Sequence, residues 1–376
     1  MNNITKLNNV LRFVKYAFVG KDEIIDLLGI CLIARENAFL LGPPGTAKSA
    51  IVRVLSSCIE GGKNFEYLLT RFTEPNEIFG PFDIQKLKEG QLVTNIEGMM
   101  PEASLVFLDE IFNANSAILN SLLMALNEKI FRRGKETITL PALMFVGASN
   151  LLPEDEALNA LLDRFLIRMK CDYVPTDLLE DVLLAGWKLE NGQPQEKPSI
   201  SPEAIVDLQK ASRKVDLSPI RKQYVDLIFN LRNTGIKVSD RRAVKCQNLL
   251  AASALMCGRD SVILSDLWVL KYIWDTEEQM EILAGLIDNI IEKEDQAGAH
   301  PQALFNKSPN AEELLKELGL LTQKWDDQSL TFEEQNVIKD KLRYLQTRSK
   351  WINNMEHKAH LEKEIDALWQ KMLQTI

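Results

Sequence analysis

A glycine-rich segment near residue 45 has the residue types needed to bind a triphosphate. Its residues are Gly42, Pro43, Pro44, Gly45, Thr46, Ala47, Lys48, Ser49 and Ala50. Glycines let the backbone turn so that successive amide N–H groups point at phosphate oxygens, and a following helix adds its positive N-terminal end. Lys48 is expected to contact the β- and γ-phosphates, and the Ser49 hydroxyl to bind Mg²⁺. The pattern predicts a site for a nucleoside triphosphate with Mg²⁺, and ATP is the triphosphate we expect.

The residue before the lysine departs from the usual pattern, which has glycine there. Ala47 occupies that position. Alanine is plausible at this position if its backbone φ is negative. We therefore expect a negative φ at Ala47. A chance turn between a strand and a helix is the competing interpretation, and the fit of both spacing and context disfavours it.

Two carboxylates follow a second apolar run. Leu105–Leu108 is apolar at every position, and Asp109 and Glu110 come directly after it. The carboxyl ends of parallel strands are where such sheets bind ligands. We expect Asp109 to hold Mg²⁺ through water and Glu110 to orient and deprotonate the attacking water. Without the phosphate loop upstream, a solvated acidic pair at a strand end would be the better interpretation.

Three further polar positions are candidates for the same chemistry. Asn150 follows an apolar run and could bond the γ-phosphate or the attacking water, or simply be a turn asparagine. Arg164 could stabilise transition-state charge on the γ-phosphate of a neighbouring subunit, or form a surface ion pair with Asp163. Arg241 and Arg242 begin a helix after Ser239; one of them could contact the nucleotide, or both could be solvated.

The elements that must position these residues alternate between helix and strand. Helical periodicity covers about residues 4–36, and apolar strands are expected at 38–41, 65–69, 105–108 and 143–148. Alternation of this kind predicts an α/β fold with a parallel sheet flanked by helices. Two interruptions, 80–98 and 130–141, resemble hairpins that turn near Gly90 and Gly134.

Three regions are expected along the chain. Residues 1–189 form an α/β nucleotide-binding core, 190–284 a linker and an all-helical lid, and 285–376 a helical C-terminal region. In that last region four apolar residues have near-heptad spacing, which predicts a helical hairpin or short coiled coil. They are Ile338, Leu342, Leu345 and Ile352.

The composition excludes several classes of protein. Apolar residues make up 46% and charged residues 26%, and the net charge of −9 disfavours a protein that coats nucleic acid. The chain has five cysteines and three histidines, and no two cysteines are spaced as a pair of metal ligands, which disfavours a zinc site. No apolar run is long enough for a membrane span, and the first residues do not resemble a signal peptide. We therefore expect a cytoplasmic protein.

Several consecutive segments together resemble one family. They read LLGPPGTAKS, YLLTRFTEPNEIFGP, PEASLVFLDEIFNANSAILNSLLMALNEKIFRRG, GASNLLPEDEALNALLDRFLIR and VSDRR. Over about residues 5–280 the chain is similar to AAA+ ATPases, more narrowly to the MoxR family, and most closely to its RavA-like branch. The resemblance implies a P-loop NTPase core with two hallmark hairpins, the helix-2 insert (80–98) and the pre-sensor-1 hairpin (130–141), and an all-α lid.

The resemblance also implies roles. Lys48 and Ser49 would be Walker A residues, Asp109 and Glu110 Walker B, Asn150 sensor 1, Arg164 an arginine finger acting in trans, Arg241 (or else Arg242) sensor 2, and Val19 and Gly20 the contact for adenine. Family members typically form hexameric rings and work with a partner that carries a von Willebrand factor A domain, in chaperone-like or metal-insertion tasks. The sequence leaves ATP versus GTP open. The alternative is a nucleic-acid-associated motor, kept open by the basic cluster at Arg132, Arg133 and Lys135.

Overall fold

The computed structural model describes most of the chain. The described residues are 2–191, 197–291, 298–305, 311–325, 338, 342, 345–346, 349 and 355–374. By their contacts they divide into two units, residues 1–300 and 301–376. The sequence places the start of the C-terminal region at residue 285, whereas helix α12 (Gln279–Ile291) runs through that position.

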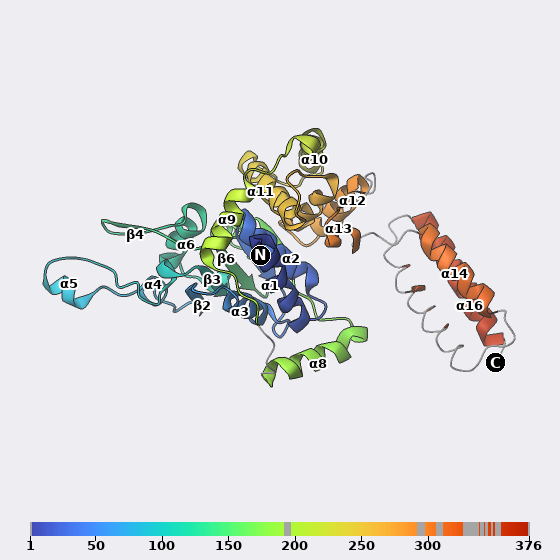
Figure 1. Ribbon diagram of the computed structural model, residues 1–376, viewed down its shortest axis with the longest axis horizontal. Helices are drawn as coiled ribbons and strands as arrows, with labels where there is room; N and C mark the ends of the chain where they lie inside the picture. The colour runs from blue at the N-terminus through green and yellow to red at the C-terminus, as the bar shows by residue number, and fades with distance from the viewer. Residues whose placement is uncertain are drawn as a thin grey trace. The chain divides into compact units, whose positions relative to one another are not determined.

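A five-stranded parallel sheet forms the centre of the first unit (Figure 1). The strand order is β2-β3-β6-β1-β7. The strands are β1 (Ala38–Leu41), β2 (Asn64–Leu68), β3 (Leu105–Asp109), β6 (Met144–Ser149) and β7 (Ile167–Lys170). The predicted α/β fold with a parallel sheet is confirmed.

Strand β7 is the member of the sheet that the sequence did not predict. Its residues alternate between apolar and basic types, Ile167-Arg168-Met169-Lys170, so it lacks the continuous apolar run of the other central strands. It pairs with β1 in parallel register, with Phe39 opposite Arg168. The missed strand matters because it carries the segment that contains Arg164 to the edge of β1.

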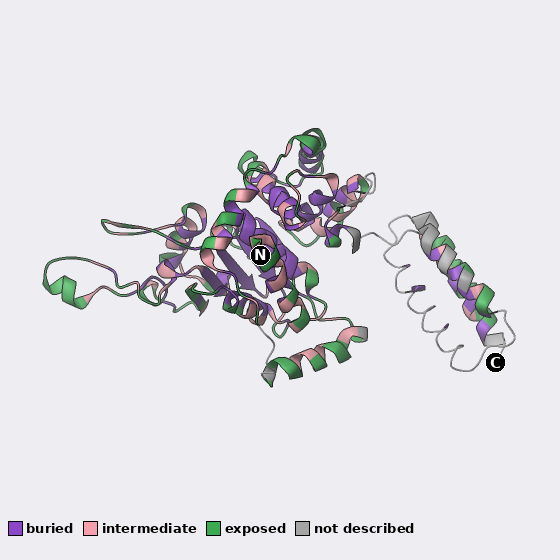
Figure 2. Cartoon of the chain, in the orientation of Figure 1, coloured by how far each residue is buried: buried purple, intermediate pink, exposed green. Residues whose placement is uncertain are grey.

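Helices cover the sheet and connect its strands. The predicted helical stretch 4–36 is two helices, Asn3–Ala17 and Asp22–Ala34. Most residues of the second helix are buried, and fewer residues of the first (Figure 2). Apart from a short helix within residues 80–98, the helices of this part of the chain are α1 (Asn3–Ala17), α2 (Asp22–Ala34), α3 (Lys48–Ser57), α4 (Pro75–Phe79), α6 (Ser116–Glu128), α7 (Glu156–Leu162) and α8 (Leu179–Glu190). Helix α8 contacts α1 and lies apart from the sheet (Figure 1). No helix in the described ranges is long and apolar enough to cross a membrane.

The all-helical lid follows the sheet. It contains α9 (Pro202–Ser212), α10 (Arg221–Asn233), α11 (Asp240–Met256), the 3₁₀ helix η5 (Leu264–Tyr272) and α12. A buried ion cluster fastens it to the core: Asp275 accepts hydrogen bonds from Arg168 of β7 and from Arg242 of α11. The pKa of Arg168 is lowered to about 10, mainly by burial and also by the nearby charge of Arg242, although Asp275 acts to raise it. One carboxylate between two buried guanidinium groups fixes where α11 begins relative to the sheet.

The two interruptions differ from each other in structure. Residues 130–139 form the predicted hairpin, β4 (Ile130–Arg133) paired with β5 (Glu136–Thr139). Residues 80–98, which we call the insert loop, double back in the predicted way, but through one antiparallel bridge, Phe82 with Thr94, and a short helix, α5 (Ile84–Lys88). The sequence did not predict that helix, which the Asp83 side chain caps by accepting from the amides of residues 85 and 86.

The hairpin and the insert loop are joined to each other. Glu136 accepts hydrogen bonds from the amide and the hydroxyl of Thr94, at 3.0 and 2.9 Å. Arg133 donates to the Gly80 carbonyl at 2.7 Å and lies 3.8 Å from the Phe82 ring centroid. These contacts hold the bases of the two segments together.

The C-terminal unit has its own apolar core. Three of the residues with near-heptad spacing, Ile338, Leu342 and Leu345, are buried in it together with residues of α14 (Ala311–Trp325) and α16 (Met355–Gln374). The fourth, Ile352, lies outside the described residues. A short helix, α13 (Pro301–Phe305), opens the unit.

Candidate functional site

The phosphate loop lies at the carboxyl end of β1. Its first residue, Gly42, donates its amide to the Ser149 carbonyl of β6 at 3.1 Å, which continues the sheet pairing into the loop. A Cβ atom on Gly42 would lie 2.1 Å from the Cys171 carbonyl oxygen, so only glycine fits between the ends of the neighbouring strands β6 and β7. Packing therefore explains the first glycine of the pattern, independently of any ligand.

The expectation of a negative φ at Ala47 is wrong. Ala47 has φ 66° and ψ 18°, in the left-handed region, and it is the N-cap of α3. A residue with a Cβ in this conformation costs about 1–2 kcal/mol relative to the right-handed one. The loop keeps the backbone path that the usual glycine adopts, and Ala47 follows it under strain.

Lys48 is buried inside the loop, with 7% of its surface exposed. Its Nζ donates to the carbonyl oxygens of Gly42 and Pro43, at 2.5 and 3.0 Å, and to Asn150 Oδ1 at 3.1 Å. An ammonium group has three protons to donate, and these three oxygens accept them. The structure thus brings together Lys48 and Asn150, which are 102 positions apart in the sequence.

Glu110 joins the same group of side chains. Asn150 donates its Nδ2 to Glu110 Oε1 at 2.5 Å. Burial raises the pKa of Glu110, and the neighbouring charge of Asp109 raises it further. A carboxylate with a raised pKa at the end of a central strand is a suitable proton acceptor. Glu110 also has a left-handed backbone, φ 49°, which turns it away from the strand direction.

Two oxygen donors are available for Mg²⁺ at this edge of the sheet. Ser49 stands in the first turn of α3 after β1, and Asp109 ends β3. Hydroxyl and carboxylate oxygens are the ligands that Mg²⁺ prefers, with water completing its coordination. Asp109 Oδ1 accepts the Glu110 amide at 3.0 Å, which leaves its other oxygen for a further ligand. The residues present therefore fit a magnesium ion bound together with phosphates.

A largely apolar cavity of about 370 Å³ adjoins the loop. Its walls include Val19, Thr46, Ala47, Tyr173 and residues of α8. Of the predicted pair Val19-Gly20, Val19 lines this cavity, whereas Gly20, at φ 73°, is not among its lining residues and packs toward Val174. The Tyr173 hydroxyl donates to the Pro44 carbonyl at 3.3 Å, and the Thr46 hydroxyl to Pro43 at 2.9 Å. A cavity of this size and lining can accept a nucleobase.

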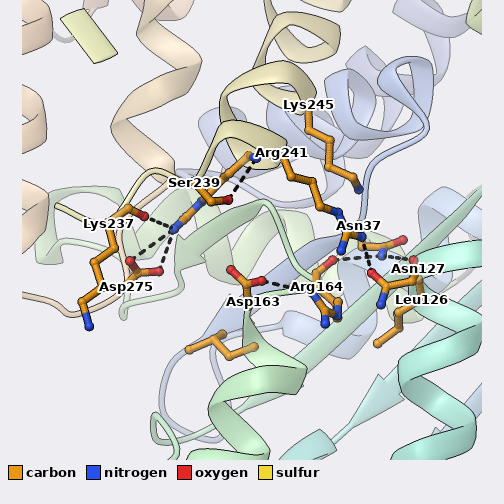
Figure 3. Close-up of polar contacts among 12 residues, drawn as sticks. Asn37, Leu126, Asn127, Asp163, Arg164, Lys237, Ser239, Arg241, Lys245 and Asp275 are labelled. Carbon is orange, nitrogen blue, oxygen red and sulfur yellow. Dashed lines mark hydrogen bonds and ion pairs between the residues drawn. The ribbon is translucent and has the colours of Figure 1, made fainter. Parts of the chain in front are cut away.

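The arginine candidates lie at the opposite edge of the sheet (Figure 3). The Arg164 carbonyl accepts a hydrogen bond from Asn37, which directly precedes β1, whereas the phosphate loop follows β1. A strand rise of about 3.3 Å per residue separates Asn37 from Gly42 by about 16 Å. Arg164 Nη1 pairs with Asp163 at 3.1 Å, so the expected ion pair exists, and its buried Nε has no hydrogen-bond partner in the described part of the chain.

The structure separates Arg241 from Arg242. Arg242 is 5% exposed and is used in the ion cluster with Asp275, and its amide is capped by the Ser239 hydroxyl at 3.2 Å. Arg241 is exposed and donates to Asn127 Oδ1 at the end of α6. Arg241 and Arg164 line one small pocket together with Asn127 and Lys245. The structure does not bring Arg241 to the phosphate loop of its own chain.

Four polar residues at this edge were not found from the sequence. They are Asn37, Asn127, Lys129 and Asp275. Each one acts through a partner that is distant in the chain, and none belongs to a local motif, so the sequence offered no signal for them. Arg168 was missed with its strand.

Comparisons with known proteins identify the family of the chain. Residues 5–210 match the family described as the MoxR domain in the MoxR-vWA-beta-propeller ternary systems, and residues 216–287 match an AAA lid domain. The chain is 34% identical to the Methanocaldococcus jannaschii protein MJ0079 over 77% of this chain and 75% of that protein. It is 36% identical to MJ0812 of the same organism over 69% of each.

Two more distant relatives carry informative names. The chaperone MoxR1 of Mycobacterium tuberculosis is 24% identical over 67% of this chain and 70% of that protein. A crystal structure of a Cytophaga hutchinsonii protein with an ATPase designation superposes with a TM-score of 0.63 and 20% identity. That superposition covers 78% of this chain and 95% of the other, and it supports the fold alone.

Proposed function

Because the chain belongs to the MoxR family of AAA ATPases, we propose that it hydrolyses ATP with Mg²⁺ at sites that two copies complete. The observation that carries the proposal is the division of the candidate residues between two edges of one sheet. Lys48, Asn150 and Glu110 are in contact at the carboxyl edge, whereas Arg164 and Arg241 lie at the amino edge.

The carboxyl edge supports binding and attack. The loop amides and Lys48 would hold the β- and γ-phosphates, and Asn150 would orient the attacking water. Glu110 would take the proton as the water oxygen bonds to the γ-phosphorus and the bond to the β–γ bridging oxygen breaks, releasing ADP. Mg²⁺, bound by Ser49 and Asp109, would neutralise charge on the phosphate oxygens.

The amino edge supports a role in trans. Arg164 and Arg241 are each anchored at the end of α6, Arg164 through Asn37 and Arg241 through Asn127. Neither side chain contacts the phosphate loop of its own chain through any hydrogen bond or ion pair that the structure describes, so a second copy is the natural recipient of their positive charge. Head-to-tail contacts of this kind close into rings, and a hexamer is the ring that we propose.

The test uses mixtures of two inactive variants. Arg164→Ala keeps its own loop and Glu110 but lacks the arginine, and Glu110→Gln keeps the arginine but lacks the base. Each alone should show ATP turnover reduced by about 10²-fold or more. Mixed in equal amounts, they should recover activity, because about one interface in four then joins a site with an intact Glu110 to an intact arginine. If ATP turnover did not recover in assembled mixtures, the result would contradict the action of Arg164 in trans.

We further propose that hydrolysis remodels a partner protein with a von Willebrand factor A domain, or drives insertion of a metal cofactor into it. The support is the description of the matching family, which names MoxR, vWA and β-propeller components together. A pull-down with Glu110→Gln and ATP, which should trap the assembled state, should retain such a partner. The Arg164→Ala variant, tested beside it, should retain less of it.

The nucleic-acid alternative has lost part of its support. Of the basic cluster on the β4–β5 hairpin, Arg133 is bonded to Gly80 and stacked on Phe82. Arg132 and Lys135 remain exposed, on a chain whose net charge is −9. A filter-binding assay with DNA and RNA should therefore show no tight, steeply salt-dependent binding.

A further inference from the structure

Asn37 uses its side chain to join three separate elements. It is 2% exposed and directly precedes β1. Its Nδ2 donates to the carbonyl of Leu126 in α6 at 3.1 Å and to the carbonyl of Arg164 at 3.0 Å. Its Oδ1 accepts from Lys129 Nζ at 2.7 Å. Both amide protons are thus used, and a primary amide is the neutral side chain that offers two donors and an acceptor together.

Lys129 determines which way that amide points. It is 9% exposed, and its Nζ lies 4.2 Å from the Phe145 ring centroid. Lys129 Nζ donates to the amide oxygen, and the two carbonyls can only accept, so the amide nitrogen is turned toward them. The pKa of Lys129 is lowered to about 7, mainly by burial and also by the charges of Arg35 and Lys245, although Glu36 acts to raise it.

The backbone anchor is the firmest restraint on Arg164. Its guanidinium is 23% exposed and pairs with an Asp163 side chain that is 55% exposed, and such pairs hold geometry weakly. Gly147 adds a packing restraint, since a Cβ there would lie 2.8 Å from the Phe165 ring. A displacement of about 1 Å in a catalytic group can cost about 10²-fold in rate.

We propose that Asn37, oriented by Lys129, is a positioning residue that sets the place of Arg164 in the active site of the neighbouring subunit. This inference rests on the proposed action of Arg164 in trans. Asn37 touches no substrate and acts only through the Arg164 backbone. Its effect must therefore appear in the neighbour's turnover and not in its own nucleotide binding.

The first test replaces Asn37 with an isosteric carboxylate. Asn37→Asp keeps the shape and the acceptor for Lys129 but removes both donors. We expect kcat to fall by about tenfold or more while KM for ATP stays unchanged, because the nucleotide contacts lie at the other edge. Lys129→Met, which keeps the apolar stem and removes the donor, should change kcat in the same direction by less. It also provides a second variant should Asn37→Asp fold poorly.

A matched control exists on α9. Gln209 is 7% exposed and donates to the Leu32 carbonyl at 2.9 Å, so Gln209→Glu is the same exchange of a buried amide for a carboxylate. It should leave kcat near the wild-type value, with melting temperature measured for both variants. An equal loss of kcat in Gln209→Glu would mean general damage and would overturn the inference.

The decisive readout is rescue in mixed assemblies. Asn37→Asp mixed with Glu110→Gln should be more active than either alone, because the intact site of one copy then receives a correctly placed arginine from the other. If Arg164→Ala is rescued by Glu110→Gln and Asn37→Asp is not, Asn37 has a structural role and the inference fails while the proposed function stands. If neither variant is rescued, the trans arrangement fails and takes the inference with it.

Discussion

The two edges of the sheet are built in different ways. At the carboxyl edge, Lys48, Asn150 and Glu110 contact one another directly, and the loop between β1 and α3 lies against the ends of the strands. At the amino edge, Arg164 and Arg241 do not contact each other through any hydrogen bond that the structure describes. Each is instead held by an asparagine: Arg241 by Asn127 of α6, and Arg164 by Asn37, which precedes β1 and also bonds to Leu126 of α6.

This difference indicates what each edge must do. A set of residues that contacts itself can bind and activate a ligand from one chain, as the phosphate loop does. Arg241 is exposed and Arg164 is partly exposed, and neither contacts the phosphate loop of its own chain through a hydrogen bond that the structure describes, so both suit a contact with another chain. The sheet therefore separates the two halves of a catalytic site, and the following changes test that separation.

Glu110→Gln should have the largest effect of the changes considered, because it removes the proton acceptor at the carboxyl edge. We expect kcat to fall by about 10²–10⁴-fold with ATP binding retained. Turnover would be followed by phosphate release, and binding by a fluorescent ATP analogue. As a control, Glu203→Gln replaces an exposed carboxylate of α9 and should match the wild type. Normal turnover in Glu110→Gln would show that Glu110 is not the base.

Arg241→Ala should have a smaller effect at the amino edge. It removes a charge-assisted contact worth about 1.5–3 kcal/mol, which corresponds to about ten- to a hundredfold in kcat. Lys210→Ala, an exposed lid substitution, is the control. Recovery on mixing with Glu110→Gln would place Arg241 in the same trans group as Arg164, whereas a raised KM without recovery would place it with the nucleotide of its own chain.

Lys129→Met should change how stability depends on pH. The folded pKa of Lys129 is about 7, against 10.5 for an unperturbed lysine, so between these values the unfolded chain binds more protons than the folded one. The free energy of unfolding gains a contribution that rises with pH across this window, and Lys129→Met should remove it. Urea unfolding at pH 7 and pH 9 would measure this; equal pH dependence in both proteins would contradict the burial of a titrating lysine.

Ala47→Gly should have the smallest effect. Glycine adopts a φ of 66° without the Cβ penalty, but it also increases the entropy of the unfolded chain, so we expect stabilisation of less than about 1 kcal/mol. Ala50→Gly in the first turn of α3 should destabilise instead, because the backbone of Ala50 is right-handed helical and glycine gains nothing there. A loss of stability in Ala47→Gly would show that the left-handed backbone there is not strained.

Sequence reasoning succeeded where a pattern is local. The phosphate loop, the acidic pair and the β4–β5 hairpin each depend on adjacent residues, and the structure has the strand, turn or helix that each pattern predicts. It failed where the outcome depends on a distant partner. The φ of Ala47 is set by the path between β1 and α3, and β7 is a strand because β1 offers it a free edge.

The candidate site shows the same limit. Asn150 and Glu110 could be named from their positions after strands, but their mutual contact could not. The choice between Arg241 and Arg242 depends on Asp275, which is 33 residues beyond Arg242 in the sequence. Arg242 forms an ion pair with Asp275, whereas Arg241 stays exposed. The roles of all these residues in catalysis stay predictions until the variants are measured.

The joined bases of the insert loop and the β4–β5 hairpin have a mechanical consequence. Thr94 bonded to Glu136 and Arg133 stacked on Phe82 join the insert loop and the hairpin at their bases, and we call the joined segments the arm. The arm continues into Lys129 at its root, directly before β4, and so into the amide of Asn37. Hydrogen bonds therefore connect the base of the arm, through Lys129 and Asn37, to the backbone of Arg164, and a displacement of that base is expected to displace Arg164 as well.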